Sequence, residues 1–166
     1  MRGRQAIVKR IITFGTFDVF HVGHVNILER ARALGDHLTV GVSSDALNIA
    51  KKGRAPVYSE RHRVRIIQAL RVVDHVFVEE SLEKKLEYIV EHRADVLVMG
   101  SDWKGRFDEM REHCEVVYLP RTPSISTTEV IEVVRQNGDA SLAEPADAGS
   151  ERVVTPAPDP AGDPAS

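Results

Sequence analysis

Little in the 166-residue sequence points to a secreted, membrane-bound or nucleic-acid-binding protein. The single cysteine, Cys114, excludes an internal disulfide, as is usual in a reducing cytoplasm. Basic residues at the N-terminus are not followed by an apolar segment, and polar side chains interrupt residues 11–20, so we expect no signal peptide and no membrane insertion. A formal net charge of −3 gives no reason to expect a nucleic-acid partner. We therefore expect a cytoplasmic protein.

Two common nucleotide-binding motifs are also absent. No G-x-G-x-x-G follows the first apolar run, which argues against a NAD-dependent dehydrogenase. No G-x-x-x-x-G-K-[ST] occurs, which argues against a P-loop kinase. A phosphate-binding site in this chain must therefore be built from other residues.

Acidic residues and proline gather at the C-terminal end. Residues 138–166 contain six acidic residues, one arginine and five of the eight prolines. Their large apolar side chains are only Leu142, Val153 and Val154, too few to offset the cost of ordering the segment. We expect one domain over residues 1–137 and a disordered acidic tail rich in proline and alanine over residues 138–166.

Short apolar runs rich in valine and isoleucine alternate with amphipathic segments before that tail. The apolar residues of each run are mostly consecutive, as in strands covered on both faces. The alternation predicts an α/β fold with a five-stranded parallel sheet flanked by helices. Strands are expected at residues 11–15, 38–43, 75–78, 95–100 and 115–119, and helices at 22–34, 60–73, 82–92, 105–113 and 127–136. Ligands of such sheets bind beyond the carboxyl ends of the strands, here at residues 15–22, 44–59, 100–104 and 120–126.

Two histidines lie where the first strand is expected to turn into a helix. The free N–H groups and dipole of a helix N-terminus favour phosphate, and His21 and His24 are one helical turn apart, so both can donate to the same anion. Gly15 and Gly23 allow a close approach of the backbone, and Thr16 adds a hydroxyl. A zinc pair and ordinary helix-start residues are the alternative interpretations of the histidines, and no cysteine or third histidine lies nearby.

A second phosphate site is expected at the start of the last helix. Ser126, Thr127 and Thr128 offer hydroxyls and free N–H groups, and Arg121 just before them can bind phosphate oxygens with two donors. A plain serine or threonine N-cap is the alternative.

These residues lie in motifs that resemble a known family. "GTFDVFHVGH", residues 15–24, resembles the first signature of the nucleotidyltransferases that include the cytidylyltransferases, and "RTPSISTTEVI", residues 121–131, resembles the second. "MGSDW", residues 99–103, fits between them, and the order and spacing are closest to those of the bacterial glycerol-3-phosphate cytidylyltransferases. The resemblance implies a Rossmann-like nucleotidyltransferase fold, usually a homodimer, that joins a nucleoside triphosphate to a small phosphate ester and releases pyrophosphate.

The resemblance also implies the roles of individual residues. The expected catalytic residues are His21, His24, Lys51 and Arg121. The expected nucleotide-binding residues are Gly15, Thr16, Phe17, Gly23, Asp102, Thr122, Ile125, Ser126, Thr127 and Thr128. The expected acceptor-binding residues are Arg63 and Lys85. On the residues alone, Lys51 belongs to an ordinary basic loop, Lys85 to a solvated helix face and Asp102 to a helix cap.

The sequence departs from the family pattern at three positions. Gly53 replaces a basic residue that Lys52 or Arg54 would have to supply, Leu82 replaces an aromatic residue, and Ser124 replaces a glycine.

The predicted reaction joins CTP to a phosphate acceptor, most simply glycerol 3-phosphate, giving CDP-glycerol and pyrophosphate. A Mg²⁺ ion would be bound mainly through the triphosphate, with no metal ligands expected from the protein. Another polyol phosphate, a hydroxyalkylphosphonate, or ATP with a sugar phosphate are alternative substrates. A nucleotide-sensing module is the non-enzyme alternative, although no phosphate-contacting residue is missing.

Overall fold

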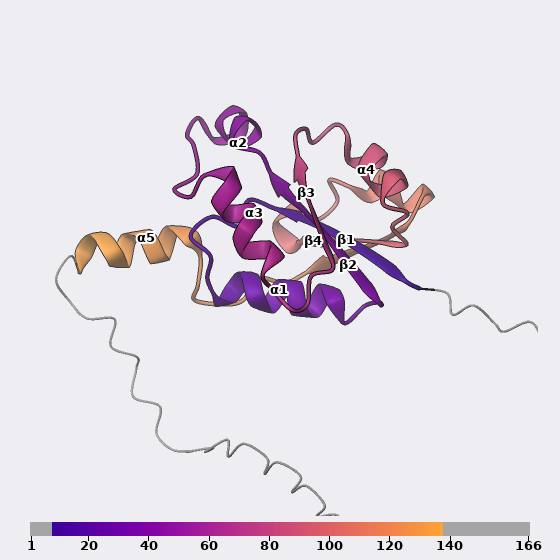
Figure 1. Cartoon of the computed structure of the whole chain (residues 1–166), viewed down its shortest axis with the longest axis horizontal. Coiled ribbons are helices and arrows are strands. Elements are labelled where there is room, and N and C mark those ends of the chain that lie inside the picture. Colours follow the sequence, from indigo (N-terminus) through magenta and orange to yellow (C-terminus); the bar gives the residue numbers. More distant parts are fainter. Residues whose placement is uncertain (1–7, 138–166) are drawn as a thin grey trace, which may run out of the picture. The chain divides into compact units, whose positions relative to one another are not determined.

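Five parallel strands form a single sheet in the computed structural model, which describes residues 8–137 (Figure 1). The strand order is β3-β2-β1-β4-β5, and every neighbouring pair is parallel. The strands are β1 (Arg10–Gly15), β2 (His37–Ser43), β3 (His75–Glu79), β4 (Val96–Gly100) and β5 (Glu115–Leu119). The predicted α/β fold with a five-stranded parallel sheet is therefore confirmed. The predicted tail, residues 138–166, lies outside the described residues.

The central strands are buried on both faces, as their consecutive apolar residues predict. Ile11 and Ile12 are neighbours in β1, point to opposite faces and are both 0% exposed. Ile11 belongs to one core cluster with Leu28 and Ile67, and Ile12 belongs to the other with Ile89. The sheet thus separates two apolar cores.

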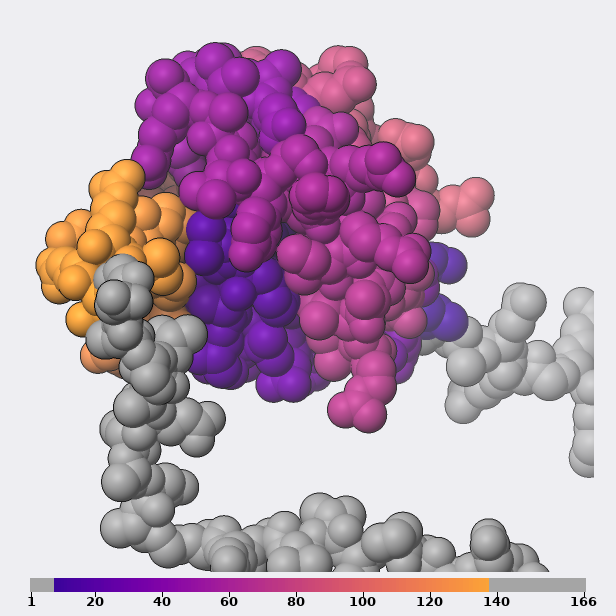
Figure 2. All heavy atoms as spheres, turned by 60° about the vertical axis from the view of Figure 1, so that its left-hand side comes forward, coloured from indigo at the N-terminus to yellow at the C-terminus, as the bar shows by residue number. Residues whose placement is uncertain are grey.

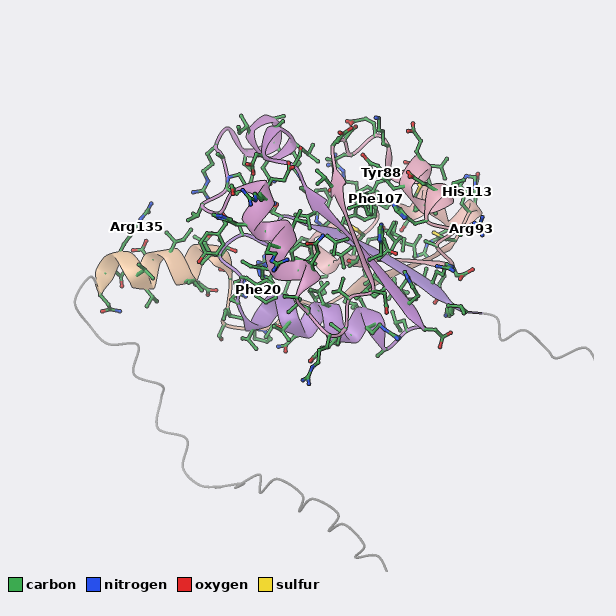
Figure 3. All side chains as sticks on the ribbon, in the orientation of Figure 1. Phe20, Tyr88, Arg93, Phe107, His113 and Arg135 are labelled. Carbon is green, nitrogen blue, oxygen red and sulfur yellow. The ribbon has the colours of Figure 1, made fainter. Side chains whose placement is uncertain are left out.

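Helices cover both faces of the sheet. One core is closed by α1 (Val22–Arg32) and α3 (Glu60–Gln68), and the other by α4 (Lys85–Glu91) and the 3₁₀ turn η2 (Asp108–Glu112). Tyr88 of α4 and Phe107 beside η2 point into the second core (Figure 3). No helix within residues 8–137 is long and apolar enough to cross a bilayer.

The last helix, α5 (Thr127–Gln136), is exposed over most of its length. Figure 2 shows it in orange at the edge of the molecule, and Arg135 points away from the domain in Figure 3. Val134 is 60% exposed, so α5 adds little to the core. Its contribution is made at its first turn, which faces the cavity described below.

Three helix predictions need correction. Residues 45–52 were expected in a loop but form α2 (Asp45–Lys52), because the Ser44 hydroxyl caps Leu47 N–H at 3.0 Å and Gly53 ends the helix with φ +69°. Residues 105–113 were expected as one helix but contain a 3₁₀ turn, η2, which follows a shorter 3₁₀ turn, η1 (Ser101–Trp103). The predicted helix 60–73 ends at Gln68.

Candidate active site

A cavity of about 730 Å³ opens beyond the carboxyl ends of the strands. Gly15, Ser43, Glu79 and Gly100 contribute to its wall from the ends of β1, β2, β3 and β4. It lies at the switch point of the sheet, because β1 is followed by β2 on one side and has β4 as its neighbour on the other. Every predicted site residue lines this cavity except Arg63.

The two histidines stack at the start of α1, with ring centroids 3.9 Å apart. His21 is the N-cap residue, and its Nδ1 accepts a hydrogen bond from Gly23 N–H at 3.1 Å. His24 Nδ1 accepts from His21 N–H at 3.4 Å. Because Nδ1 is the acceptor in both rings, the proton of each neutral imidazole is assigned to Nε2. The helix cap therefore leaves each ring with an Nε2–H donor.

Burial favours the neutral form of both rings. The pKa of His24 is lowered to about 4, chiefly by desolvation and then by the neighbouring His21 and Arg121, while Asp18 acts in the opposite direction. Desolvation and Arg121 also lower the pKa of His21. At neutral pH the two rings therefore present two hydrogen-bond donors rather than two cations. A bound phosphate would favour their protonation, since a nearby negative charge raises a histidine pKa.

Glycines at this site make room for side chains. A Cβ atom on Gly23 would lie 2.8 Å from His21 Cε1 and 3.1 Å from Ile125 Cγ2. A Cβ atom on Gly15 would lie 2.8 Å from Phe17 Cζ. In the structure, the groups that come close to the backbone at Gly23 and Gly15 are the chain's own aromatic rings and Ile125. These side chains shape the cavity wall.

The loop between β1 and α1 is held in an unusual backbone conformation by Asp18. Phe17 and Val19 have φ values of +52° and +44°, a region that β-branched residues such as valine rarely enter. The Asp18 carboxylate accepts from Val57 N–H at 2.7 Å and Tyr58 N–H at 2.8 Å. The backbone carbonyl of Asp18 accepts from the Thr127 hydroxyl at 2.9 Å. These bonds tie the histidine loop to the segment after α2 and to the first turn of α5.

A further part of the cavity wall comes from the chain between β5 and α5. Asn26 of α1 donates to the Thr122 hydroxyl at 3.2 Å, and Glu129 N–H donates to the Ser126 hydroxyl at 3.2 Å. Arg121 Nη1 lies 3.1 Å from Asp102 Oδ2, and both side chains are more than half exposed. An exposed ion pair is worth at most about 1 kcal/mol, so a phosphate can draw Arg121 away from Asp102 at little cost.

Lys51 reaches the cavity from the last turn of α2. Its Nζ lies 3.5 Å from Ser43 Oγ, and burial lowers its pKa. Asn48, one turn earlier and 1% exposed, accepts from the Thr16 hydroxyl at 2.7 Å and donates to Ser43 and Ser44 carbonyls. Asn48 thereby fixes α2 against the end of β1, which sets the direction of Lys51.

The structure does not bring Arg63 to the cavity. Its side chain is 0% exposed, and its guanidinium donates to the Thr16 and Ser43 carbonyls at 2.8 Å each and to the Tyr58 carbonyl at 2.9 Å. It also pairs with Asp45 at 2.6 Å. These contacts indicate that Arg63 holds the segments around Thr16, Ser43 and Tyr58 in place, and its role in acceptor binding stays a prediction.

Lys85 lines the cavity but is not a solvated helix residue. It is 1% exposed and forms an ion pair with Glu79, which is equally buried. Its Nζ lies 3.3 Å from the centroid of the Phe14 ring.

Sequence reasoning missed Asp18, Asn48 and Glu79. Asp18 lies inside the first signature motif, so the motif itself was the available signal. Asn48 could have been found only by predicting α2 first. The signals for α2 in the sequence are its N-cap residue, Ser44, and the glycine that ends it, Gly53. Glu79 follows an apolar run without any motif, and only its burial in the structure marks it.

The pattern of the family described as Cytidylyltransferase-like matches residues 12–133. The chain belongs to the cytidylyltransferase-like family. The matched range contains both histidines, Lys51, Lys85, Arg121 and the first turns of α5, so the family pattern spans the whole cavity.

Bacterial members of this family are similar over nearly their full length. The glycerol-3-phosphate cytidylyltransferase of Bacillus subtilis (strain 168) is 48% identical over 127 residues, which cover 76% of this chain and 98% of that protein. The protein of the same description from Staphylococcus aureus is 42% identical over 123 residues, 74% of this chain and 92% of its own. A solved lipopolysaccharide core biosynthesis protein from Thermoplasma volcanium GSS1 aligns with a TM-score of 0.60 at 25% identity, covering 69% of this chain and 98% of that one.

The departures from the cytidylyltransferase pattern have structural consequences. Gly53 occupies a left-handed C-cap that favours glycine, while Lys52 and Arg54 on either side both line the cavity. Leu82 also lines the cavity. Ser124 has φ +58°, a conformation that favours the glycine usual at this position.

Proposed function

We propose that the chain transfers a cytidylyl group from CTP to glycerol 3-phosphate, giving CDP-glycerol and pyrophosphate. One observation carries the proposal: donors from two helix N-termini and the ammonium of Lys51 converge on one cavity at the switch point of the sheet. Such helix ends bind phosphate through free N–H groups and the helix dipole. The names and lengths of the bacterial relatives support the choice of nucleotide and acceptor.

The proposed reaction requires positioning and charge stabilisation. An oxygen of the acceptor phosphate attacks the α-phosphorus of CTP, the new O–P bond forms, and the bond from that phosphorus to the pyrophosphate oxygen breaks. The attacking oxygen is already anionic near neutral pH, so no general base is needed. His21, His24, Lys51 and Arg121 would stabilise the charge that develops on the phosphoryl oxygens.

The donor set of the cavity fits a Mg²⁺ ion carried by the nucleotide. The Asp18 and Glu79 carboxylates are already bound by backbone N–H groups and Lys85, and no three His, Cys, Asp or Glu side chains within residues 8–137 are placed to hold an ion together. The ion would neutralise triphosphate charge and would be held mainly by phosphates and waters.

The base pocket is proposed between η1 and the start of α5. Trp103 lines the cavity and packs on Phe107 with centroids 5.6 Å apart, so it would limit the size of the base. Asp102 beside it offers an acceptor for the exocyclic amine of cytosine.

We expect CTP to be preferred over ATP by at least about 10²-fold in kcat/KM, which is roughly 2.7 kcal/mol of transition-state binding. UTP should also be poor, because uracil presents a carbonyl where cytosine presents an amine and would leave the pocket acceptor unpaired. Pyrophosphate release with glycerol 3-phosphate and each nucleotide measures this preference. Equal use of ATP would contradict the cytidylyl assignment and keep only the nucleotidyltransferase fold.

The remaining expectations stay predictions. Another polyol phosphate or a hydroxyalkylphosphonate would use the same phosphate-binding residues, and a panel of acceptors separates them. The homodimer and the cytoplasmic location implied at first also stay predictions, the former testable by sedimentation of the full chain.

A further inference from the structure

The proposed reaction leaves one buried carboxylate of the cavity without a role. Glu79 is the last residue of β3 and is 1% exposed. One of its carboxylate oxygens pairs with the Lys85 ammonium, and the other accepts from the Ser43 hydroxyl at 2.7 Å. A carboxylate repels phosphate, so its burial in a phosphate-binding cavity calls for a specific reason.

The surroundings of Lys85 supply that reason. Its ammonium lies between the Phe14 ring at 3.3 Å and the Phe107 ring at 5.5 Å, and Lys51 of α2 adds a second positive charge. Arg106, also in the cavity wall, acts on Lys51 in the same sense. Desolvation and Lys51 favour the neutral amine and lower the pKa of Lys85 to about 8, although Glu79 raises it. Among the charged groups named here, Glu79 alone favours the ammonium form.

We propose that Glu79 is the positioning residue of the acceptor subsite, which keeps Lys85 protonated and fixed at the floor of the cavity. Through Ser43 it also connects Lys85 to Lys51, whose Nζ lies 3.5 Å from Ser43 Oγ. That outer contact is long, so the Glu79 charge acts chiefly on Lys85, with which it is directly paired. Glu79 itself does not touch the acceptor, because both of its oxygens are occupied. The inference rests on the proposed function and on the acceptor-binding role that the family resemblance implies for Lys85.

The test is Glu79→Gln, which keeps the shape and removes the charge. Glu80→Gln is the matched control, because Glu80 is the next residue, is 73% exposed and pairs with Lys84 at 3.8 Å on the surface. Without the Glu79 charge the pKa of Lys85 falls, so Lys85 loses its proton at a lower pH than in the parent. We expect kcat/KM for glycerol 3-phosphate to fall about 10-fold or more at pH 8, mainly through KM, while KM for CTP changes less than about twofold.

The pH profile separates this role from a purely structural one. The ratio of variant to parent kcat/KM for the acceptor should decrease as the pH rises from about 6.5 to about 8.5, because Lys85 loses its proton at a lower pH in the variant than in the parent. Titration of the acceptor phosphate cancels in that ratio. An unchanged acceptor kcat/KM, or an equal loss for acceptor and CTP at every pH, would overturn the proposal.

A second comparison covers the case in which Glu79→Gln alone does not fold. Lys85→Met and the double variant Glu79→Gln/Lys85→Met both lack the ammonium, and the double variant leaves no unpaired buried charge. If Glu79 acts through Lys85, these two variants have the same kcat/KM for the acceptor. A further acceptor-specific loss in the double variant would overturn the proposal.

Isothermal titration calorimetry of glycerol 3-phosphate binding compares the parent with Glu79→Gln at pH values of about 6.5 and about 8.5 without turnover. A parent that binds glycerol 3-phosphate but forms no product would contradict the proposed function and leave the Glu79 comparison readable. A parent that reacts while Glu79→Gln matches it would contradict only the role of Glu79. A parent that does not bind would contradict both.

Discussion

His24→Ala is expected to turn over at about one hundredth of the parent rate under saturating substrates, the scale of losing one transition-state donor. The Nδ1 atom of His24 is occupied by His21 N–H, so in the proposed reaction the ring would meet the triphosphate through Nε2–H, a donor that alanine cannot replace. The domain should still fold, because His24 lies at a cavity wall, although loss of the cap lowers stability by about 1 kcal/mol.

His62→Ala is the control for this prediction, since His62 is exposed on α3 and faces no part of the cavity. Turnover of both variants is measured by pyrophosphate release, and folding is checked by circular dichroism. A folded His24→Ala protein with near-normal turnover would remove His24 from the mechanism.

Arg63→Met is expected to lower the free energy of unfolding by about 3–5 kcal/mol. Methionine fills much of the space but leaves the Thr16 and Tyr58 carbonyls without the guanidinium donor, the Ser43 carbonyl with Asn48 as its remaining side-chain donor, and Asp45 without its cation. Unsatisfied buried acceptors each carry a desolvation cost, so the three loops around the cavity should loosen together.

Urea denaturation of Arg63→Met and of Arg61→Met, an exposed arginine on the same helix, measures the difference. Arg61→Met should change stability by less than about 0.5 kcal/mol. If Arg63→Met kept the stability of the parent and lost only acceptor kcat/KM, the result would contradict this structural role and support the predicted role of Arg63 in acceptor binding.

The sequence predicted the sheet because strand identity depends on short, consecutive apolar runs. Ile11 and Ile12 are both apolar and both buried, one on each face, which is the pattern that a parallel sheet requires. The position of the site followed from the sheet, since four of its strands end at the cavity. Helices that depend on their caps were harder to predict. The helix α2 is short, and the signal for it comes from Ser44 and Gly53 more than from hydrophobic periodicity.

The site residues likewise fall into two groups, those that a sequence motif places and those whose burial only the structure shows. His21, His24 and Arg121 lie in motifs whose spacing fixes their place, so the sequence was sufficient to bring them to one cavity. The burial of Arg63 and Lys85 could not be predicted from the sequence. It depends on contacts with residues of other elements, such as Thr16 for Arg63 and Phe14 for Lys85. A basic residue on a helix looks the same in sequence whether it faces water or closes a polar network.

The central claim is that the cavity joins CTP to a phosphate acceptor. Phosphorus NMR of the full chain with CTP, Mg²⁺ and glycerol 3-phosphate tests it most directly, because it identifies the product and the leaving group together. The account predicts equal amounts of pyrophosphate and of CDP-glycerol, with two coupled phosphorus signals from its new diphosphate bridge. Release of inorganic phosphate, or loss of CTP without a diphosphate-linked glycerol product, would contradict it.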